Sequence, residues 1–290
     1  MTDPQHRIAS SGIAAVLTAE GAELCSLTDA AGREYLWQAG PVWPRHAPVL
    51  FPIVGRLAGD TLRHDGRSYQ MTQHGFARDR RFALAEQSET VCRFVLADDA
   101  RTRAAFPFAF RLELTYAVAG DTLTIGYAVE NPDSAMLHAS FGAHPAFRWP
   151  LREGVGKDAH TLTFGLPEPA PIRRLRDGLL LPDRFPSPIE GQTLRLDDGL
   201  FAADAVILDQ VASPAVRYAA PGGPAIELIW RGFRELGIWS RQGGDFLCIE
   251  PWYGHADPVG FAGDFRDKPG LLHIPPGGRA EAEVMIRLLP

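Results

Sequence analysis

The sequence predicts an all-β protein, a large and largely antiparallel β-sandwich, from three observations. Alternation of apolar and polar residues dominates the chain, and few windows place apolar residues at helical spacing. The chain also carries 24 prolines and 29 glycines, scattered along its 290 residues. Both residue types suit turns between strands better than helix interiors. Chains of this length often form one all-β domain.

The clearest strands are predicted where apolar residues occupy every second position. Over 110–118, apolar residues alternate with Arg, Glu, Thr and Ala, and over 123–129 with smaller or polar ones. The link 119–121, Ala-Gly-Asp, fits a hairpin turn between them. Further strands are predicted at 91–97, 225–230 and 283–288. Each pattern places apolar side chains on one face, as a half-buried antiparallel sheet needs.

Residues 165–192 contain six prolines, which is compatible with a linker between domains. The same stretch holds three consecutive leucines at 179–181, which a free linker would expose to water. We therefore favour a long excursion that packs against one sheet.

Composition and charge exclude several classes of protein. The formal charge is −6, which argues against nucleic-acid binding by charge alone. Three widely spaced cysteines form no C-x-x-C pair, so a thiolate zinc site or a disulfide framework is not expected. The N-terminus is polar, and no apolar run of about 18 residues is present to cross a membrane. A soluble cytoplasmic protein without a membrane partner is expected.

Two segments in the first third of the chain place polar side chains next to apolar residues. An apolar run with two prolines, 46–54, is followed by Gly55 and Arg56. Arg56 is either an exposed residue after a buried strand or a guanidinium aimed into a pocket, where it would offer several fixed donors. In 73–78, QHGFAR, His74 precedes a glycine that allows a sharp turn; a structural or solvated role is the alternative to a functional one.

Two later segments carry an imidazole and a carboxylate. In 141–149, FGAHPAFRW, His144 is flanked by aromatic residues such as Phe147, whose rings could stack on a sugar. A hydrogen-bonded core histidine is the alternative. In 246–254, FLCIEPWYG, Glu250 follows an apolar strand and precedes Trp252, a possible sugar platform. Loss of solvent raises the pKa of such a carboxyl toward that of a useful general base, although a surface carboxylate would also fit.

The sequence lacks the common motifs of metal-dependent and covalent catalysis. The sequence contains no H-x-H, H-E-x-x-H or G-x-S-x-G, and no glycine-rich loop that reads as a phosphate cradle. Acid–base chemistry without a metal or other cofactor is what remains.

The sequence resembles the aldose 1-epimerase (mutarotase) superfamily, most closely its LacX-like branch. Five segments carry the resemblance in the family's order: GRLAGD at 55–60, QHGFAR at 73–78, GAHPAF at 142–147, DAVIL at 204–208 and CIEPWYG at 248–254. Each is weak alone, but the ordered set is fairly specific. The resemblance covers nearly the whole chain and implies one domain over 1–290, a galactose mutarotase-like β-supersandwich with its site in an open groove.

The resemblance also implies a mechanism and a set of roles. Glu250 would take the proton of the C1 hydroxyl, His144 would protonate the ring oxygen, and His74 would hydrogen-bond at the same C1–O unit. Arg56 and Asp204 would hold sugar hydroxyls. Ring opening needs an acid and a base in opposite protonation states; an ionised Glu250 and a protonated His144, each favouring the other's charge, would satisfy this.

The segments GRLAGD and IEPW depart from those usual in galactose-specific members, which puts galactose in doubt. A related branch acts on hexose 6-phosphates through an arginine cluster; Arg78, Arg80 and Arg81 could serve a phosphate or form a solvated edge.

A non-catalytic carbohydrate-binding protein is the main rival, since fold does not settle function. A glycosidase or lyase would usually want a second carboxylate, and a metal-dependent isomerase would need closer ligands. A small sugar is the expected partner of a monomer or weak homodimer.

Overall fold

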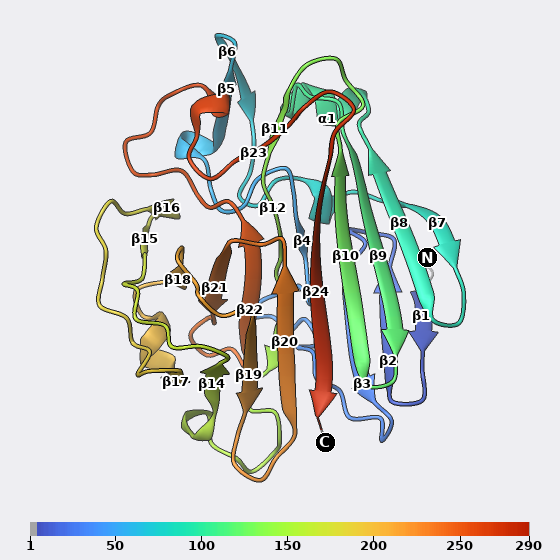
Figure 1. Cartoon of the computed structure of the whole chain (residues 1–290), viewed down its shortest axis with the longest axis vertical. Helices are drawn as coiled ribbons and strands as arrows, with labels where there is room; N and C mark the ends of the chain where they lie inside the picture. The colour runs from blue at the N-terminus through green and yellow to red at the C-terminus, as the bar shows by residue number, and fades with distance from the viewer. Residues whose placement is uncertain (1–4, 290) are drawn as a thin grey trace.

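The computed structural model describes residues 5–289, and Figure 1 shows that strands make up nearly all of its regular secondary structure. This confirms the predicted all-β, largely antiparallel fold. The largest sheet contains nine strands: β7 (Ala83–Gln87), β8 (Val91–Ala97), β9 (Arg111–Ala119), β10 (Thr122–Glu130), β14 (Thr161–Phe164), β17 (Thr193–Arg195), β19 (Ala215–Ala219), β20 (Ala225–Arg231) and β24 (Arg279–Leu289). Their order across the sheet is β17-β14-β19-β20-β24-β10-β9-β8-β7.

All five strands predicted from alternation lie in this sheet, as β8, β9, β10, β20 and β24. The predicted hairpin is also confirmed: Ala119 pairs with Thr122, so Gly120 and Asp121 form the two-residue turn between β9 and β10. Gly120 has φ +57°, a left-handed conformation that glycine adopts without steric cost.

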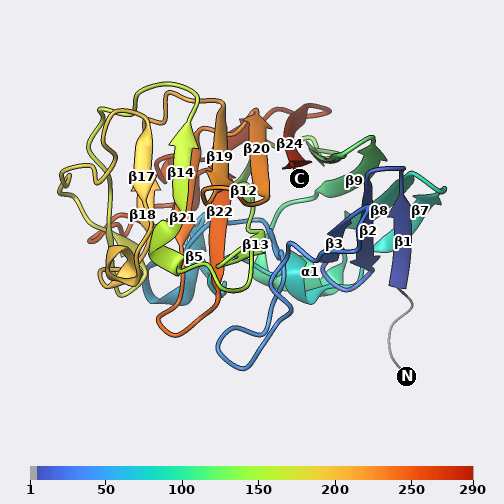
Figure 2. The same ribbon diagram turned by 90° about the horizontal axis from the view of Figure 1, so that it is seen from below.

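Two smaller sheets face the large one. A three-stranded sheet, β1 (Gln5–Ala9), β2 (Ile13–Thr18) and β3 (Leu24–Asp29), lies in front of β8 and β9 in the view of Figure 2. A six-stranded sheet lies beside the other half: β4 (Val49–Leu50), β12 (Phe141–Ala143), β13 (Ala146–Arg148), β18 (Val206–Leu208), β21 (Glu235–Trp239) and β22 (Phe246–Tyr253). In it β22 pairs with β21, β12 and β13.

The remaining elements are short. Three hairpin-like or bridging pairs complete the strands: β5 (Thr61–His64) with β6 (Arg67–Gln70), β11 (Leu137–Ala139) with β23 (Leu272–Ile274), and β15 (Leu175–Arg176) with β16 (Leu179–Leu180). The helical segments are α1 (Ala100–Ala105) and single 3-10 turns at Ala58–Asp60, Ala77–Asp79, Lys157–Ala159, Asp198–Phe201 and Phe265–Asp267. Asp99 and Thr102 form a capping box that begins α1.

One large hydrophobic core joins all three sheets, because the inward faces of their strands supply its members. The proline-rich excursion 165–192 packs on the six-stranded sheet, as expected. Its Leu180 is buried in a second cluster with Leu50, Val54, Ile207 and Trp252. The excursion therefore forms part of the wall around Trp252.

Within residues 5–289, no helix is both long and apolar enough to cross a membrane. The first four residues of the polar N-terminal segment lie outside the described part of the chain.

Candidate active site

A cavity of about 580 Å³ opens beside β22, where β12, β18 and β21 meet the loops around residues 54–56, 73–78 and 201–205. It brings together five residues that the sequence analysis selected. These are His74, His144, Asp204, Glu250 and Trp252.

Glu250 and His144 form the most buried polar contact of the cavity. Glu250 stands within β22, opposite Gly237 of β21, and His144 directly follows β12. The Nε2 atom of His144 lies 3.2 Å from Oε2 of Glu250, and the two residues are only 6% and 1% exposed. An acid and a base are therefore in hydrogen-bonding contact, shielded from water on most sides.

Burial decides the protonation of this pair. It raises the pKa of Glu250 well above its usual value, and the Asp204 carboxylate adds to this effect while the Trp252 indole opposes it. Burial also lowers the pKa of His144 to about 3. Both shifts favour the neutral form of each residue, so burial acts against the expected combination of an ionised Glu250 and a protonated His144. Burial is the largest cause of both shifts, because loss of solvent penalises the charged form of each group.

Tryptophan side chains hold the imidazole of His144 in place. The Trp43 ring stacks on it, with centroids 5.2 Å apart and planes inclined by 24°, and Trp239 meets it edge-on at 6.0 Å. Neither tryptophan was selected from the sequence. Trp43 lies in a loop about 100 residues before His144, so no local pattern connects them.

The backbone around His74 orients its ring toward His144. His74 and Gly75 both have left-handed φ values, +66° and +72°. A Cβ at residue 75 would lie 2.3 Å from the carbonyl oxygen of Phe51, so only glycine fits. The Gly55 N–H donates to Nδ1 of His74 at 3.2 Å. Because a neutral imidazole carries one proton, that proton is then on Nε2.

Burial, followed by the nearby His144, lowers the pKa of His74 well below its usual value, so its ring is neutral. The two imidazole rings are edge-to-face with centroids 5.5 Å apart. His74 can therefore present an N–H donor beside the Glu250–His144 pair.

Trp252 reaches the cavity from a slot formed by two glycines on the strands that flank β22. A Cβ on Gly237 would lie 2.4 Å from the Trp252 ring, and one on Gly142 would lie 2.6 Å from it. Trp252 is 6% exposed, so it offers a sugar mainly one edge of its ring.

Asp204 and Arg78 add charge to the cavity lining. Asp204 is exposed, has φ +65°, and its carboxylate accepts the Ala205 N–H at 2.7 Å. Arg78 is more enclosed: burial lowers its pKa to about 10, and its Nη2 donates to the carbonyl oxygen of Gln73 at 2.6 Å. Its Nε is buried without a hydrogen-bond partner among the described residues.

Two expected sugar contacts lie elsewhere. Arg56 is outside the cavity lining, where its Nε and Nη2 bind both carboxylate oxygens of Asp60 at 2.7 and 2.8 Å. This bidentate pair, four residues apart, satisfies the guanidinium locally. Phe147 is fully buried in the main core, because alternation along β13 points its ring away from the site.

A loop that directly follows β22 walls the cavity through Ala256 and is held by buried charges. Lys268, which has a fully buried side chain, donates from Nζ to the carbonyl oxygen of His255 and lies 4.0 Å from Oδ1 of Asp257. Asp257 in turn accepts the Ala58 N–H at 2.8 Å. Burial lowers the pKa of Lys268 to about 8 and raises the pKa of Asp257.

His144, Cys248 and Glu250 each place one possible metal ligand within 4.8 Å of the others. Burial raises the pKa of both Cys248 and Glu250 well above their usual values. A metal ion would need the deprotonated thiol and carboxyl.

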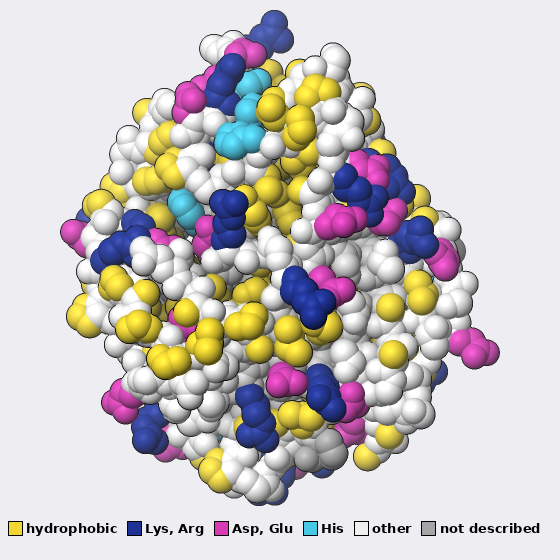
Figure 3. All heavy atoms as spheres, in the orientation of Figure 1, with side chains coloured by type: hydrophobic (Ala, Val, Ile, Leu, Met, Phe, Trp, Pro, Cys, Tyr) yellow, Lys and Arg dark blue, Asp and Glu magenta, His cyan; other side chains and the backbone are white. Residues whose placement is uncertain are grey.

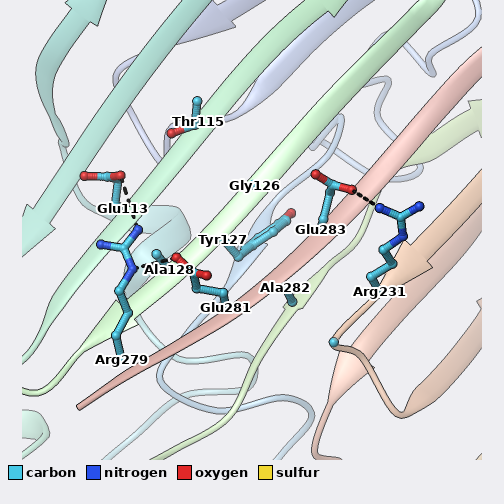
Figure 4. A pocket seen from close by; sticks show the side chains of 11 residues that line it. Glu113, Thr115, Gly126, Tyr127, Ala128, Arg231, Arg279, Glu281, Ala282 and Glu283 are labelled. Atoms are coloured by element: carbon cyan, nitrogen blue, oxygen red, sulfur yellow. Dashed lines mark hydrogen bonds and ion pairs between the residues drawn. The ribbon is translucent and has the colours of Figure 1, made fainter.

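A second hollow, of about 390 Å³, lies over β9, β10 and β24 of the large sheet (Figure 4). Its charged side chains are already paired: Arg279 with Glu281 and Glu113, and Arg231 with Glu283. It has neither a buried acid nor a buried base, in contrast to the cavity beside β22.

Comparison with known families agrees with this geometry. Residues 4–268 match the model of the family described as aldose 1-epimerase. The chain belongs to the aldose 1-epimerase family. Protein LacX of Lactococcus lactis subsp. lactis, in its chromosomal and its plasmid forms, is 32% identical over 268 residues, which cover 88% of this chain and 90% of LacX.

Solved structures of aldose 1-epimerase relatives share the fold. A galactose mutarotase related enzyme from Lactobacillus acidophilus superposes with a TM-score of 0.91 at 30% identity, covering 99% of this chain and 98% of its own. A galactose mutarotase-like protein from Lactobacillus casei gives a TM-score of 0.91 at 31% identity, covering 98% and 100%. These relatives confirm the galactose mutarotase-like fold and the resemblance to LacX.

Proposed function

We propose that this protein is an aldose 1-epimerase that interconverts the α and β anomers of an aldohexose by opening and reclosing the ring. One observation carries the proposal: the buried contact of 3.2 Å between Nε2 of His144 and Oε2 of Glu250 at the cavity wall. Opening the ring moves one proton off the C1 hydroxyl and another onto the ring oxygen. A coupled acid and base can do both at once.

In the proposed mechanism, the resting pair carries one mobile proton on Glu250 beside a neutral His144. Transfer of that proton to Nε2 gives a carboxylate and an imidazolium without changing the charge of the site. Glu250 then takes the proton of the C1 hydroxyl, the C1–O5 bond breaks with its electron pair going to O5, and His144 protonates O5. Rotation about C1–C2 and reversal of these steps give the other anomer.

The neighbouring residues suit supporting roles. The Nε2–H of His74 can donate to the ring oxygen or the C1 oxygen, and Asp204 can accept from hydroxyls at the mouth of the cavity. The edge of Trp252 offers apolar contact for the sugar. For Arg56 to bind a hydroxyl, its guanidinium would have to leave Asp60.

A hexose 6-phosphate is a second candidate substrate, favoured by the enclosed guanidinium of Arg78 in the cavity lining. Of the arginines around it, Arg80 lies over the Phe76 ring and Arg81 pairs with Glu20, so neither supports a phosphate site. Arg241 also lines the cavity and could provide a second cation.

Polarimetry tests the proposal. Freshly dissolved α-glucose, α-galactose and glucose 6-phosphate are followed with wild-type protein and with Glu250→Gln and His144→Asn. We expect the wild type to accelerate mutarotation of at least one sugar, and each substitution to reduce the rate by a factor of about 10² or more. Full activity in Glu250→Gln would refute the assignment of the base. Saturable sugar binding without acceleration would instead support the carbohydrate-binding alternative.

A further inference from the structure

Three histidines lie together outside the candidate active site. His64 ends β5, His138 is the middle residue of β11, and His273 is the middle residue of β23. Figure 3 shows histidine side chains gathered on the surface at the end of the molecule where these strands lie. His273 is exposed, and His64 and His138 are partly exposed. None of the three lines the cavity around Glu250, and the proposed mechanism does not use them.

The strand pairing brings two of these imidazoles into contact. His138 and His273 are directly opposite each other in the antiparallel pair β11–β23, so their side chains share one face. Their Nδ1 atoms are 2.7 Å apart, and the ring planes are inclined by 77°. At this distance one Nδ1 donates its proton to the other. Loss of that shared proton to the other ring nitrogen would leave two acceptor nitrogens side by side, in a position that the backbone of both strands fixes.

This spacing is close to that of two ligands on one metal ion. Two nitrogens bound at about 2.05 Å are roughly 2.9 Å apart at a right angle and about 3.3 Å apart in a tetrahedral site. Opening the present contact by a few tenths of an ångström would admit an ion, and rotation of the exposed His273 ring can supply that. Imidazole nitrogen is a favoured ligand of zinc, copper and nickel.

We propose that His138 and His273 form a surface chelate for a divalent transition-metal ion such as Zn²⁺ or Ni²⁺, with His64 as a third ligand.

His64 has the arrangement expected of a ligand held by its surroundings. Its Nδ1 lies 3.0 Å from Oδ1 of Asp264, and its Nε2 lies 3.5 Å from Oδ2 of the exposed Asp65. Nε2, which has the weaker of these contacts, is the nitrogen that would bind an ion. Its ring centroid is 6.2 Å from that of His138, and Phe108 contacts both rings. To join the pair, the His64 ring would have to turn Nε2 away from Asp65, and the effect of His64 on affinity is therefore expected to be the smallest of the three.

The nearby carboxylates are less suited to bind the ion directly, because they already have partners. Asp264 accepts the backbone N–H of Asp65 at 2.8 Å and the Nε of Arg266 at 3.0 Å. Arg266 also pairs with Asp65. The site is therefore expected to select ions that prefer nitrogen over the hard oxygen-binding cations Mg²⁺ and Ca²⁺.

Isothermal titration calorimetry with ZnCl₂, NiCl₂ and MgCl₂ tests the proposal on full-length protein that carries no histidine tag. We expect one saturable Zn²⁺ or Ni²⁺ per chain and no response to Mg²⁺. His138→Gln and His273→Gln should each weaken binding at least tenfold, and His64→Gln should weaken it by a smaller factor. Circular dichroism of each variant checks that the fold is retained.

Two controls locate the ion. His6→Gln removes an exposed histidine that contacts Gln87 far along the chain, and it should leave the affinity unchanged. Glu250→Gln removes a possible ligand of the His144–Cys248–Glu250 group and should also leave it unchanged. Wild-type affinity in both His138→Gln and His273→Gln, or no saturable binding in the wild type, would overturn the proposal. Neither result bears on the sugar chemistry.

Discussion

Burial raises the pKa of Glu250 and lowers that of His144, so the two residues make stability depend on pH in opposite ways. A carboxyl whose pKa rises on folding binds its proton more tightly in the folded state than in the unfolded one. Its contribution is therefore fully present below the unfolded pKa of 4.5 and is lost as the pH rises toward the higher folded pKa. His144, with its pKa lowered to about 3, acts in the opposite direction: it costs stability as the pH falls from 6.5 toward 3.

The first prediction isolates the Glu250 effect. In Glu250→Gln the side chain no longer has a proton to lose, so its stability relative to wild type should increase with pH. The difference in free energy of unfolding should grow by up to about 1.4 kcal/mol per pH unit above pH 4.5 until the folded pKa is reached. Urea unfolding at pH 5, 7 and 9 measures it. A difference that is flat across this range would contradict the raised pKa.

The second prediction concerns activity at low pH. Because protonation of His144 removes the acceptor for the mobile proton, kcat/KM should fall on the acid side with a pKa near 3, not near the ordinary histidine value of 6.5. Polarimetry in buffers from pH 3.5 to 8 checks this, after the protein is shown to stay folded. An acid limb centred near pH 6.5 would indicate a solvent-exposed histidine instead.

The third prediction separates Arg78 from its neighbour Arg80. Arg78→Gln removes an enclosed cation of the cavity lining and should raise KM about tenfold or more, with the larger effect on a phosphorylated sugar. Arg80→Gln is the matched control, since Arg80 lies over the Phe76 ring and outside the cavity lining. Equal KM values for both variants would remove Arg78 from the site.

The candidate site residues that could be predicted from the sequence are those with an unusual local pattern. His74, His144 and Glu250 stood next to glycine, proline or a long apolar run, and all three reach the cavity. Trp43 and Trp239 could not be found in this way, because their role is to pack against the His144 ring, a contact that only the tertiary fold creates. The ion pair of Arg56 with Asp60, four residues on, was not foreseen either, because no local pattern marks it.

At the scale of elements, β22 supplies most of the site. Its alternation places Cys248, Glu250 and Trp252 on one face, although the strand contains Pro251. From the sequence, this strand was expected to end before Glu250. The strand in fact runs through to Tyr253, with Pro251 opposite Leu236 of β21. Glu250 is therefore buried by strands on both sides of β22, which explains its strongly raised pKa.

The fourth prediction concerns the loop after β22. Lys268→Met removes the cation beside Asp257 and leaves a buried carboxyl without its partner, so it should destabilise the protein by about 3–5 kcal/mol. The double variant Lys268→Met/Asp257→Asn should recover part of this loss, and chemical denaturation measures both. Additive effects of the two single substitutions would show that the groups are not coupled.

For the whole molecule, one core beneath three sheets implies one cooperative unit. We expect thermal unfolding followed by far-ultraviolet circular dichroism and by tryptophan fluorescence to give coincident transitions. A bound sugar at 100 times its Kd should shift both together, since it adds about 2.7 kcal/mol to the stability of the folded state. Separate transitions would show that the six-stranded sheet and its cavity unfold independently.

Alternation predicted five of the nine strands of the large sheet and the all-β class, because each of these strands buries one face and leaves the other polar. The order of strands in space is set by contacts far apart in sequence, such as β10 with β24 and β22 with β12. Strands of two or three residues, including β4 and β12 beside the site, are too short to show any period.

The slot around Trp252 restricts which amino-acid substitutions this sheet can accept in evolution. Gly142 and Gly237 have no room for a methyl group while the indole lies between them. Replacement of either glycine is thus expected to be tolerated only after Trp252 has become smaller, and a return to tryptophan is then blocked. The three positions form an epistatic set in which the order of substitutions matters, and a library that varies them jointly should recover combinations that no single-site scan contains.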